Sequence, residues 1–104
     1  MVNEKILIET KKYVSILNNV GYNLSSAYLF GSYAKGTERT DSDLDLAVVM
    51  KIPMIDRFEE RVKLMKIAVR NNNYIIEPHP FTEEEFEEGN PFIDEIKRTC
   101  VRIV

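Results

Sequence analysis

The sequence is short of the features that mark several large classes of protein. Its single cysteine, Cys100, excludes an intramolecular disulfide, fits a reducing compartment and is expected to be packing filler. The apolar run that follows Lys5 is only three residues long, so we expect neither a signal peptide nor a membrane span. No Gly-Lys-Ser/Thr and no Gly-x-Gly-x-x-Gly occurs, which excludes a Walker loop and a dinucleotide fingerprint. These absences predict a cytoplasmic domain.

Basic charge is also in short supply. The chain holds 14 Lys and Arg against 17 Asp and Glu, a net charge of −3, which argues against a protein that mainly grips nucleic-acid backbones. The deficit is local, because residues 82–95 contain seven acids and no Lys or Arg. The other ninety residues therefore carry 14 bases against 10 acids, or +4. The acidic run is either a solvated helix face or a docking surface for a basic partner.

The length of 104 residues predicts one domain over residues 1–104. Apolar spacing, capping signals and β-rich runs predict helices over 4–19, about 55–71, a short acidic stretch after Thr82, and 91–98. They predict strands over 26–30, 44–49, 74–77 and 99–103, the third of them stopped by Pro78 and Pro80. The order of these elements indicates an α+β (mixed α/β) domain with a small sheet packed by helices.

The predicted helix over about 55–71 has an amphipathic pattern. Phe58, Val62, Met65 and Val69 fall on one stripe, and many charges lie opposite. Asn71, Asn72 and Asn73 mark its end.

Two aspartates open the second predicted strand. Asp43 and Asp45 are two residues apart, so both side chains point to the same face, while Leu44 and Leu46 face the core. Two carboxylates on one face repel each other unless a cation neutralises them, and hard oxygen donors suit Mg²⁺ or Mn²⁺. The alternative is an Asp-rich loop that caps a turn and stays solvated; the alternation with leucine favours the metal site.

Two further features surround this pair. Gly31-Ser32 leaves a hydrophobic strand, where a glycine allows close approach of the backbone and a hydroxyl can hold phosphate oxygens. Glu77 is the one acid in the third predicted strand, and an acid inside an apolar run is costly without a reason. If the two strands are neighbours, Glu77 joins Asp43 and Asp45 around two metal ions; otherwise it points into water before Pro78.

The residues Phe30-Gly31-Ser32-Tyr33-Ala34-Lys35-Gly36, then Arg39, then Ser42-Asp43-Leu44-Asp45-Leu46 resemble the signature of the DNA polymerase beta-type nucleotidyltransferases. More narrowly, the chain resembles the minimal nucleotidyltransferases (MNT proteins) of prokaryotes over about residues 25–80. The resemblance implies a mixed sheet packed by helices, and transfer of a nucleoside monophosphate to a hydroxyl with two Mg²⁺ ions.

The resemblance also implies roles for single residues. Asp43, Asp45 and Glu77 are the implied catalytic carboxylates and metal ligands, and the nucleotide-binding residues are Gly31, Ser32, Lys35 and Ser42. Lys35 and Arg39 either offset phosphate charge or are solvated loop residues. Glu77 departs from the family, which most often has Asp there; the extra methylene displaces the carboxylate by about 1.5 Å and affects the rate more than binding.

MNT proteins often pair with HEPN-domain toxins, and the resemblance implies an antitoxin that adenylylates its HEPN partner with ATP and silences its RNase activity. At 104 residues the chain is expected to lack an acceptor domain, so we expect a partner protein to bring the acceptor in a hetero-oligomer. Neither nucleic acid nor membrane is an expected partner. An alternative is an antitoxin that neutralises its partner by binding alone. A third, weaker reading is an independent enzyme that acts on a small molecule or an RNA end.

The sole histidine, His79, stands two residues after Glu77. It either shares the face of Glu77 near the site or is a surface residue on a rigid, proline-flanked exit from the strand.

Overall fold

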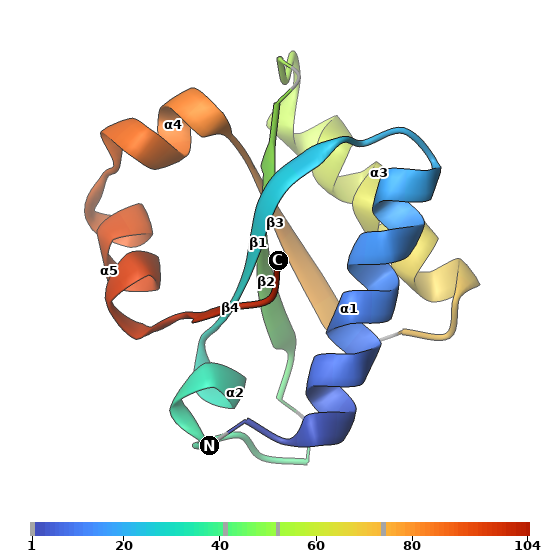
Figure 1. Cartoon of the computed structure of the whole chain (residues 1–104), viewed down its shortest axis with the longest axis vertical. Coiled ribbons are helices and arrows are strands. Elements are labelled where there is room, and N and C mark those ends of the chain that lie inside the picture. The colour runs from blue at the N-terminus through green and yellow to red at the C-terminus, as the bar shows by residue number, and fades with distance from the viewer. Residues whose placement is uncertain (1, 41, 52, 74) are drawn as a thin grey trace.

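In the computed structural model, which describes residues 2–40, 42–51, 53–73 and 75–104, helices lie on both sides of a four-stranded sheet (Figure 1). The helices are α1 (Glu4–Asn19), α2 (Ser32–Lys35), α3 (Arg57–Arg70), α4 (Glu83–Glu88) and α5 (Pro91–Thr99). The strands are β1 (Leu24–Phe30), β2 (Leu44–Met50), β3 (Ile76–Thr82) and β4 (Val101–Arg102). The predicted fold class is confirmed. None of the described helices is long and apolar enough to cross a membrane.

The strand order β3-β2-β1-β4 makes β2 an inner strand. It runs antiparallel to β1 and parallel to β3, and α3 supplies the crossover that parallel neighbours need. In this register Asp45 is opposite Phe30 on one side and Glu77 on the other. The start of β2 therefore lies between the end of β1 and the start of β3, so residues distant in sequence meet there.

The two faces of the sheet carry separate cores. On the face packed by α1 and α3 (the α1–α3 face), Leu44, Leu46, Val48 and Met50 of β2 are buried together with Tyr13, Leu17 and Leu64 of the helices, among others. On the face packed by α4 and α5 (the α4–α5 face), a smaller cluster joins the alternate strand residues to the two short helices: Phe30, Ala47, Val49, Phe81, Phe86, Ile93 and Ile96. Figure 1 shows the two helix pairs on opposite sides of the sheet.

The third strand differs from its prediction. Pro78 and Pro80 do not stop it; β3 continues through both prolines to Thr82, and Tyr74 of the predicted range lies outside the described residues. The reason is that β3 is an edge strand. The carbonyl oxygen of Pro80 accepts a bond from Arg57 rather than from β2, so this residue turns its backbone polar atoms away from the sheet. Pro78, two residues earlier, has the same orientation, and the ladder loses no donor.

The apolar stripe of α3 also departs from expectation, because an amphipathic helix usually packs its apolar stripe against the core. The buried residues of this helix are Leu64 and Ala68. Three residues of the predicted stripe are exposed: Phe58 by 75%, Met65 by 41% and Val69 by 50%. The core contact of α3 is therefore a narrow strip about a third of a turn away from the stripe.

The capping signals are confirmed. The Thr82 hydroxyl accepts from the Glu85 N–H at 3.1 Å, and the Glu85 carboxylate accepts from the Thr82 N–H at 3.0 Å, which is a complete capping box. Pro91 is the first residue of α5, whose N-cap Asn90 accepts from the Ile93 N–H at 2.8 Å.

Candidate active site

The carboxylates of Asp45 and Glu77 occupy the same face of neighbouring strands. The two residues are register partners in the parallel pair β2–β3, a spacing of about 4.8 Å between backbones. Both side chains are partly exposed, and both point to the α4–α5 face, since Leu44 and Ile76 beside them are buried on the other. Asp43, immediately before β2, is exposed. The structure thus brings Asp45 and Glu77 together, with Asp43 two residues before Asp45.

Gly31 lies directly against Asp45. Its φ is +76°, in the region that disfavours side chains, and a Cβ atom built on it would stand 2.4 Å from Oδ2 of Asp45. A side chain at this position would displace the carboxylate. The first turn after β1 and the second aspartate are therefore one packed unit, which explains why a glycine is needed there.

His79 shares the face of Asp45, so of the two alternatives for this residue the structure shows the first. Its Nε2 is 3.2 Å from Oδ1 of Asp45. The ring packs between two others, with centroids 5.0 Å from Phe30 and 6.0 Å from Phe92. These contacts fix the imidazole beside the Asp45 carboxylate, on the β3 side, whereas Gly31 lies on the β1 side.

Glu77 is paired with Arg61 of α3. One turn earlier on the same helix, Arg57 bonds the Pro80 carbonyl oxygen and Glu85. Both arginines thus reach around the open edge of β3. The buried Nε of Arg61 has no hydrogen-bond partner among the described residues, so its guanidinium is incompletely satisfied by Glu77.

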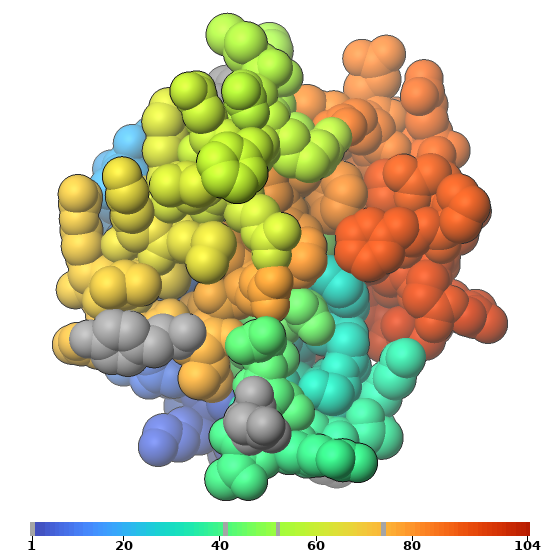
Figure 2. All heavy atoms as spheres, turned by 180° about the vertical axis from the view of Figure 1, so that it is seen from behind, coloured from blue at the N-terminus to red at the C-terminus, as the bar shows by residue number. Residues whose placement is uncertain are grey.

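A groove follows this edge of the sheet. It has a volume of about 250 Å³ and is lined by Arg57, Arg61, His79, Pro80, Phe81, Glu85, Asn90 and Phe92. Figure 2 looks onto the edge of β3, in orange, with α3 in yellow-green on one side and α5 in red-orange on the other. The groove adjoins the carboxylates through two of its lining residues, since Arg61 contacts Glu77 and His79 contacts Asp45.

Apart from Gly31, which directly precedes α2, the predicted nucleotide-binding residues lie in or after this helix. Ser32 is its first residue and is partly buried. Lys35 is 3.9 Å from the Glu95 carboxylate of α5, with both side chains nearly half exposed. The Ser42 hydroxyl accepts from the Arg39 N–H at 2.7 Å, which closes a turn just before Asp43. Ser32 directly follows Gly31 and Ser42 directly precedes Asp43, whereas Lys35 is directed towards α5.

Within residues 2–40, 42–51, 53–73 and 75–104, no three His, Cys, Asp or Glu side chains converge closely enough to hold a metal ion. The donor chemistry still fits a hard divalent cation, because Asp43, Asp45 and Glu77 offer only carboxylate oxygens. In this structure Arg61 contacts Glu77 and His79 contacts Asp45.

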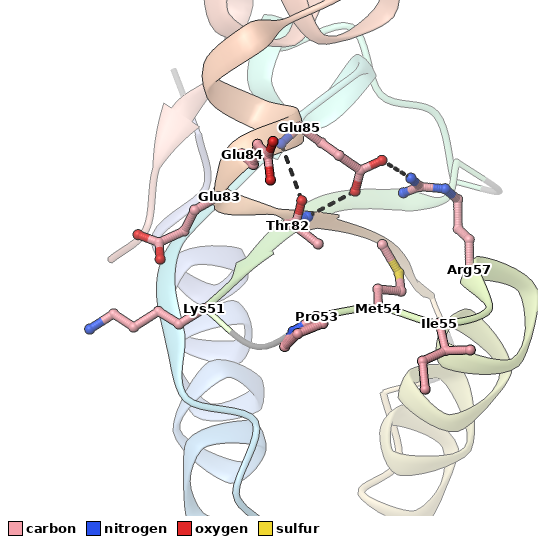
Figure 3. Close-up of a pocket in the computed structure, with 9 residues that line it drawn as sticks. All are labelled: Lys51, Pro53, Met54, Ile55, Arg57, Thr82, Glu83, Glu84 and Glu85. Carbon is pink, nitrogen blue, oxygen red and sulfur yellow. Dashed lines mark hydrogen bonds and ion pairs between the residues drawn. The ribbon is translucent and has the colours of Figure 1, made fainter.

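A larger cavity than this groove lies elsewhere, at the far ends of β2 and β3 (Figure 3). It encloses about 630 Å³ between the segment after β2 and the start of α4. Of the glutamates that line this cavity, Glu85 is held in place by the capping box and by Arg57, as the dashed lines in Figure 3 show. Burial raises the pKa of Glu85, but the Thr82 backbone bond and the charge of Arg57 outweigh it, so the pKa lies below its usual value.

The fold, the Gly31 turn and the paired carboxylates define a nucleotidyltransferase domain. Residues 11–98 match the family of polymerase beta nucleotidyltransferases, so the chain belongs to that family. Among curated proteins, none is similar enough in sequence to count as a relative.

Solved structures agree on the fold. A protein of Sulfolobus solfataricus assigned as a nucleotidyltransferase is 24% identical, with a TM-score of 0.65, covering 94% of this chain and 78% of its own. A toxin–antitoxin structure with AMP-PNP is 22% identical, with a TM-score of 0.60 and coverages of 92% and 72%. The complex of a tri-AMPylated Shewanella oneidensis HEPN toxin with its MNT antitoxin is 18% identical, with a TM-score of 0.56 and coverages of 95% and 71%. The neighbours thus include MNT antitoxins.

Sequence reasoning missed Arg61, the partner of Glu77. Its signal was weak: two arginines four residues apart, Arg57 and Arg61, in a helix rich in charge. Only the placement of α3 along the β3 edge turns that spacing into a pair of contacts with Glu77 and Glu85.

Proposed function

We propose that this chain transfers AMP from ATP to a hydroxyl group of a partner protein, and that it is an antitoxin that adenylylates and silences a HEPN toxin. The observation that carries the proposal is the in-register pair Asp45 and Glu77, packed against the Gly31 turn. The neighbouring structures support it, since one was solved with AMP-PNP and another contains an AMPylated HEPN toxin. We also propose a cytoplasmic location, which is compatible with the single cysteine of the chain.

In this proposal the triphosphate lies against the turn after β1. Gly31 leaves room for the phosphate oxygens, and the hydroxyls of Ser32 and Ser42 donate to them. Lys35 turns from Glu95, 3.9 Å away, to the phosphates; a partly exposed surface pair of this kind is worth only about 0–1 kcal/mol.

The three carboxylates Asp43, Asp45 and Glu77 would hold Mg²⁺, or Mn²⁺, in two sites. When bound, these ions neutralise the phosphate charge and stabilise the attacking and leaving oxygens. As a metal ligand, Glu77 would have to give up its pairing with Arg61, while the contact of His79 with Asp45 would keep that carboxylate oriented.

The transfer itself is a single displacement. The acceptor oxygen forms a bond to the α-phosphorus of ATP, the bond from that phosphorus to the oxygen bridging to the β-phosphorus breaks, and pyrophosphate leaves. The proton of the acceptor hydroxyl passes to the Glu77 carboxylate. Glu77 is suited to this because β3 places it on the side of Asp45 away from the Gly31 turn.

The test is incubation of the protein with ATP, Mg²⁺ and a HEPN-domain protein from the same genome, followed by intact mass measurement. We expect the partner to gain whole adenylyl groups. If both proteins are folded and no mass is added, the proposed transfer is wrong.

A second candidate is neutralisation of the partner by binding alone. It is favoured by the pairing of Glu77 with Arg61 and by the absence of a three-residue metal cluster from the described part of the chain. A double variant, Asp43→Ala with Asp45→Ala, separates the two. Full neutralisation of the toxin in cells by that variant supports binding alone, and loss of neutralisation supports transfer.

A further inference from the structure

Helix α3 presents an apolar stripe to solvent. The α3 stripe consists of Phe58, Val62, Met65 and Val69, spaced four, three and four residues apart on one side of the helix. Phe58 is 75% exposed and Val69 50%. A shallow apolar groove of about 410 Å³ runs along the stripe, between Val62, Met65 and Val69 and the stems of Lys66 and Arg70. Helix α3 lies on the face of the molecule shown in Figure 2, in yellow-green to yellow.

The concentration of exposed apolar side chains on α3 is unusual for this chain. Nine large apolar residues are largely exposed in the described part, and four of them belong to α3 or the turn before it: Ile55, Phe58, Met65 and Val69. Helix α1, which packs on the same face of the sheet, exposes Ile8 in isolation. Scattered apolar residues are normal on a surface, whereas a contiguous patch marks an interaction site.

The charged side chains beside the α3 stripe indicate what kind of protein surface would bind there. Lys63, Lys66 and Arg70 follow its solvent side, and none of them has an ion-pair partner in the described part of the chain. Glu59 stands on the same side near the N-terminus of α3, so this border is basic by two charges. A second copy of the helix would bring two basic borders together, at a cost in repulsion. An acidic partner is complementary.

The other side of the stripe leads to the carboxylates. Arg61 precedes Val62 and holds Glu77 around the β3 edge. An in-line displacement needs the attacking oxygen opposite the leaving group. With the phosphates at the Gly31 turn, pyrophosphate leaves on the β1 side of Asp45, so the acceptor enters from the β3 side, where α3 lies.

From these observations we propose that the α3 stripe binds the acceptor protein, through an amphipathic helix of that protein whose apolar residues are flanked by Asp and Glu. The proposal rests on the proposed function, because that function supplies the acceptor protein. Such a helix would lay its apolar side chains into the groove beside Val62 and Met65 and its acids beside Lys66 and Arg70.

The experiment measures binding of the intact protein to a HEPN-domain protein from the same genome, by calorimetry, and AMP transfer in the same samples. A double variant, Met65→Glu with Val69→Glu, is expected to weaken binding by about 100-fold, as for residues at the centre of an interface. Charge reversal by Lys66→Glu with Arg70→Glu is expected to weaken it by about tenfold. Ile8→Glu on α1 is the matched control, since it places the same charge at an exposed apolar site off the stripe.

The outcomes separate the two proposals. Binding lost in the stripe variants but kept in Ile8→Glu, with unfolding temperatures unchanged, supports the docking site even if no AMP is transferred. Binding and transfer unaffected by the stripe variants overturn the docking site and leave the proposed function standing. A wild-type chain that binds no HEPN protein, or that forms a dimer in light scattering which the stripe variants dissociate, also overturns the docking proposal.

Discussion

The α1–α3 and α4–α5 faces of the sheet are made by alternate residues of the same strands, yet they are covered to different extents. On the α1–α3 face, two long helices bury an unbroken apolar set that includes Leu44, Leu46 and Val48. On the α4–α5 face, two short helices cover Val49 and Phe81, whereas Asp45 and Glu77 at the strand starts stay partly exposed. Strand alternation thus allows one face to stabilise the fold while the other holds charge.

The comparison makes a general prediction. Changes at Asp45, or at Gly31 and Arg61, which contact Asp45 and Glu77, should alter chemistry more than stability. Changes between α1 and α3 should do the reverse.

The largest effect is expected for Asp45→Asn. The amide keeps the shape of the side chain but removes the charge that faces Gly31 and His79. We expect the rate of AMP transfer, followed by intact mass over time, to fall about 10³-fold, as when a charge-stabilising group is removed from an active site. Glu88→Gln on α4 is an exposed control that makes the same chemical change. A variant that keeps a tenth of the wild-type rate would show that Asp45 is not a catalytic carboxylate.

A smaller effect is expected for Gly31→Ala. Its new methyl group would stand 2.4 Å from Oδ2 of Asp45, so the carboxylate must move, and transfer should fall about 10²-fold. Gly21→Ala is the matched control: its φ is also positive, at +100°, but a Cβ there meets nothing within 4 Å. Both variants should lose about 1 kcal/mol of stability from backbone strain. Equal transfer rates in the two would mean that the contact with Asp45 is unimportant.

The third prediction concerns Arg61, the side chain that pairs with Glu77. Replacing Arg61 with Gln removes a competitor for the carboxylate, so Mn²⁺ should bind roughly tenfold more tightly in a titration followed by electron paramagnetic resonance. Arg57→Gln is the control, because its partner Glu85 lies outside the carboxylate group. If both variants bind Mn²⁺ as the wild type does, then Glu77 is not a metal ligand or Arg61 does not compete for it.

The smallest effect belongs to the α1–α3 face. The Tyr13 hydroxyl donates to the Leu64 carbonyl oxygen at 2.7 Å, and Tyr13→Phe should lower the free energy of unfolding in urea by about 1 kcal/mol, without changing transfer.

This tyrosine also makes stability depend on pH. Burial, and to a lesser extent Tyr22, raise the pKa of Tyr13 above its ordinary value of 10.0. The folded state then holds the proton more tightly than the unfolded state, so stability is full below pH 10 and falls as the pH rises further. Burial and Glu60 raise the pKa of Tyr22 to about 12, which adds to the loss. The alkaline loss should be smaller in Tyr13→Phe, and an unchanged loss would contradict this account.

Much of the fold was predictable from local patterns. Capping at Thr82 and Pro91 and the apolar run after Asp43 each depend on residues close in sequence, and each is found in the structure. The end of β3 was not predictable, because whether Pro78 interrupts a ladder depends on the side of the strand that is paired, which is a property of the whole sheet. The exposure of Phe58 had the same origin, since periodicity shows a stripe but not what it packs against.

The candidate site divides in the same way. The spacing of Asp43 and Asp45 and the lone acid at Glu77 pointed to neighbouring carboxylates, and the parallel register pairs Asp45 with Glu77. Lys35, in contrast, pairs with Glu95 on α5, and the role of Arg61 was not predicted. Both involve long side chains whose direction is set by tertiary neighbours, so no local pattern encodes them.

The two prolines of β3 have a consequence for association. An unpaired strand at a sheet edge is a template on which another chain can add as a further strand, by β-augmentation or in a growing fibril. Pro78 and Pro80 lack the donors that such an addition needs, and Arg57 already occupies the Pro80 carbonyl oxygen. The opposite edge, β4, has only two residues. A protein that approaches these carboxylates therefore meets side chains rather than an open ladder, and the sheet is protected from polymerisation at the edge where its chemistry is exposed.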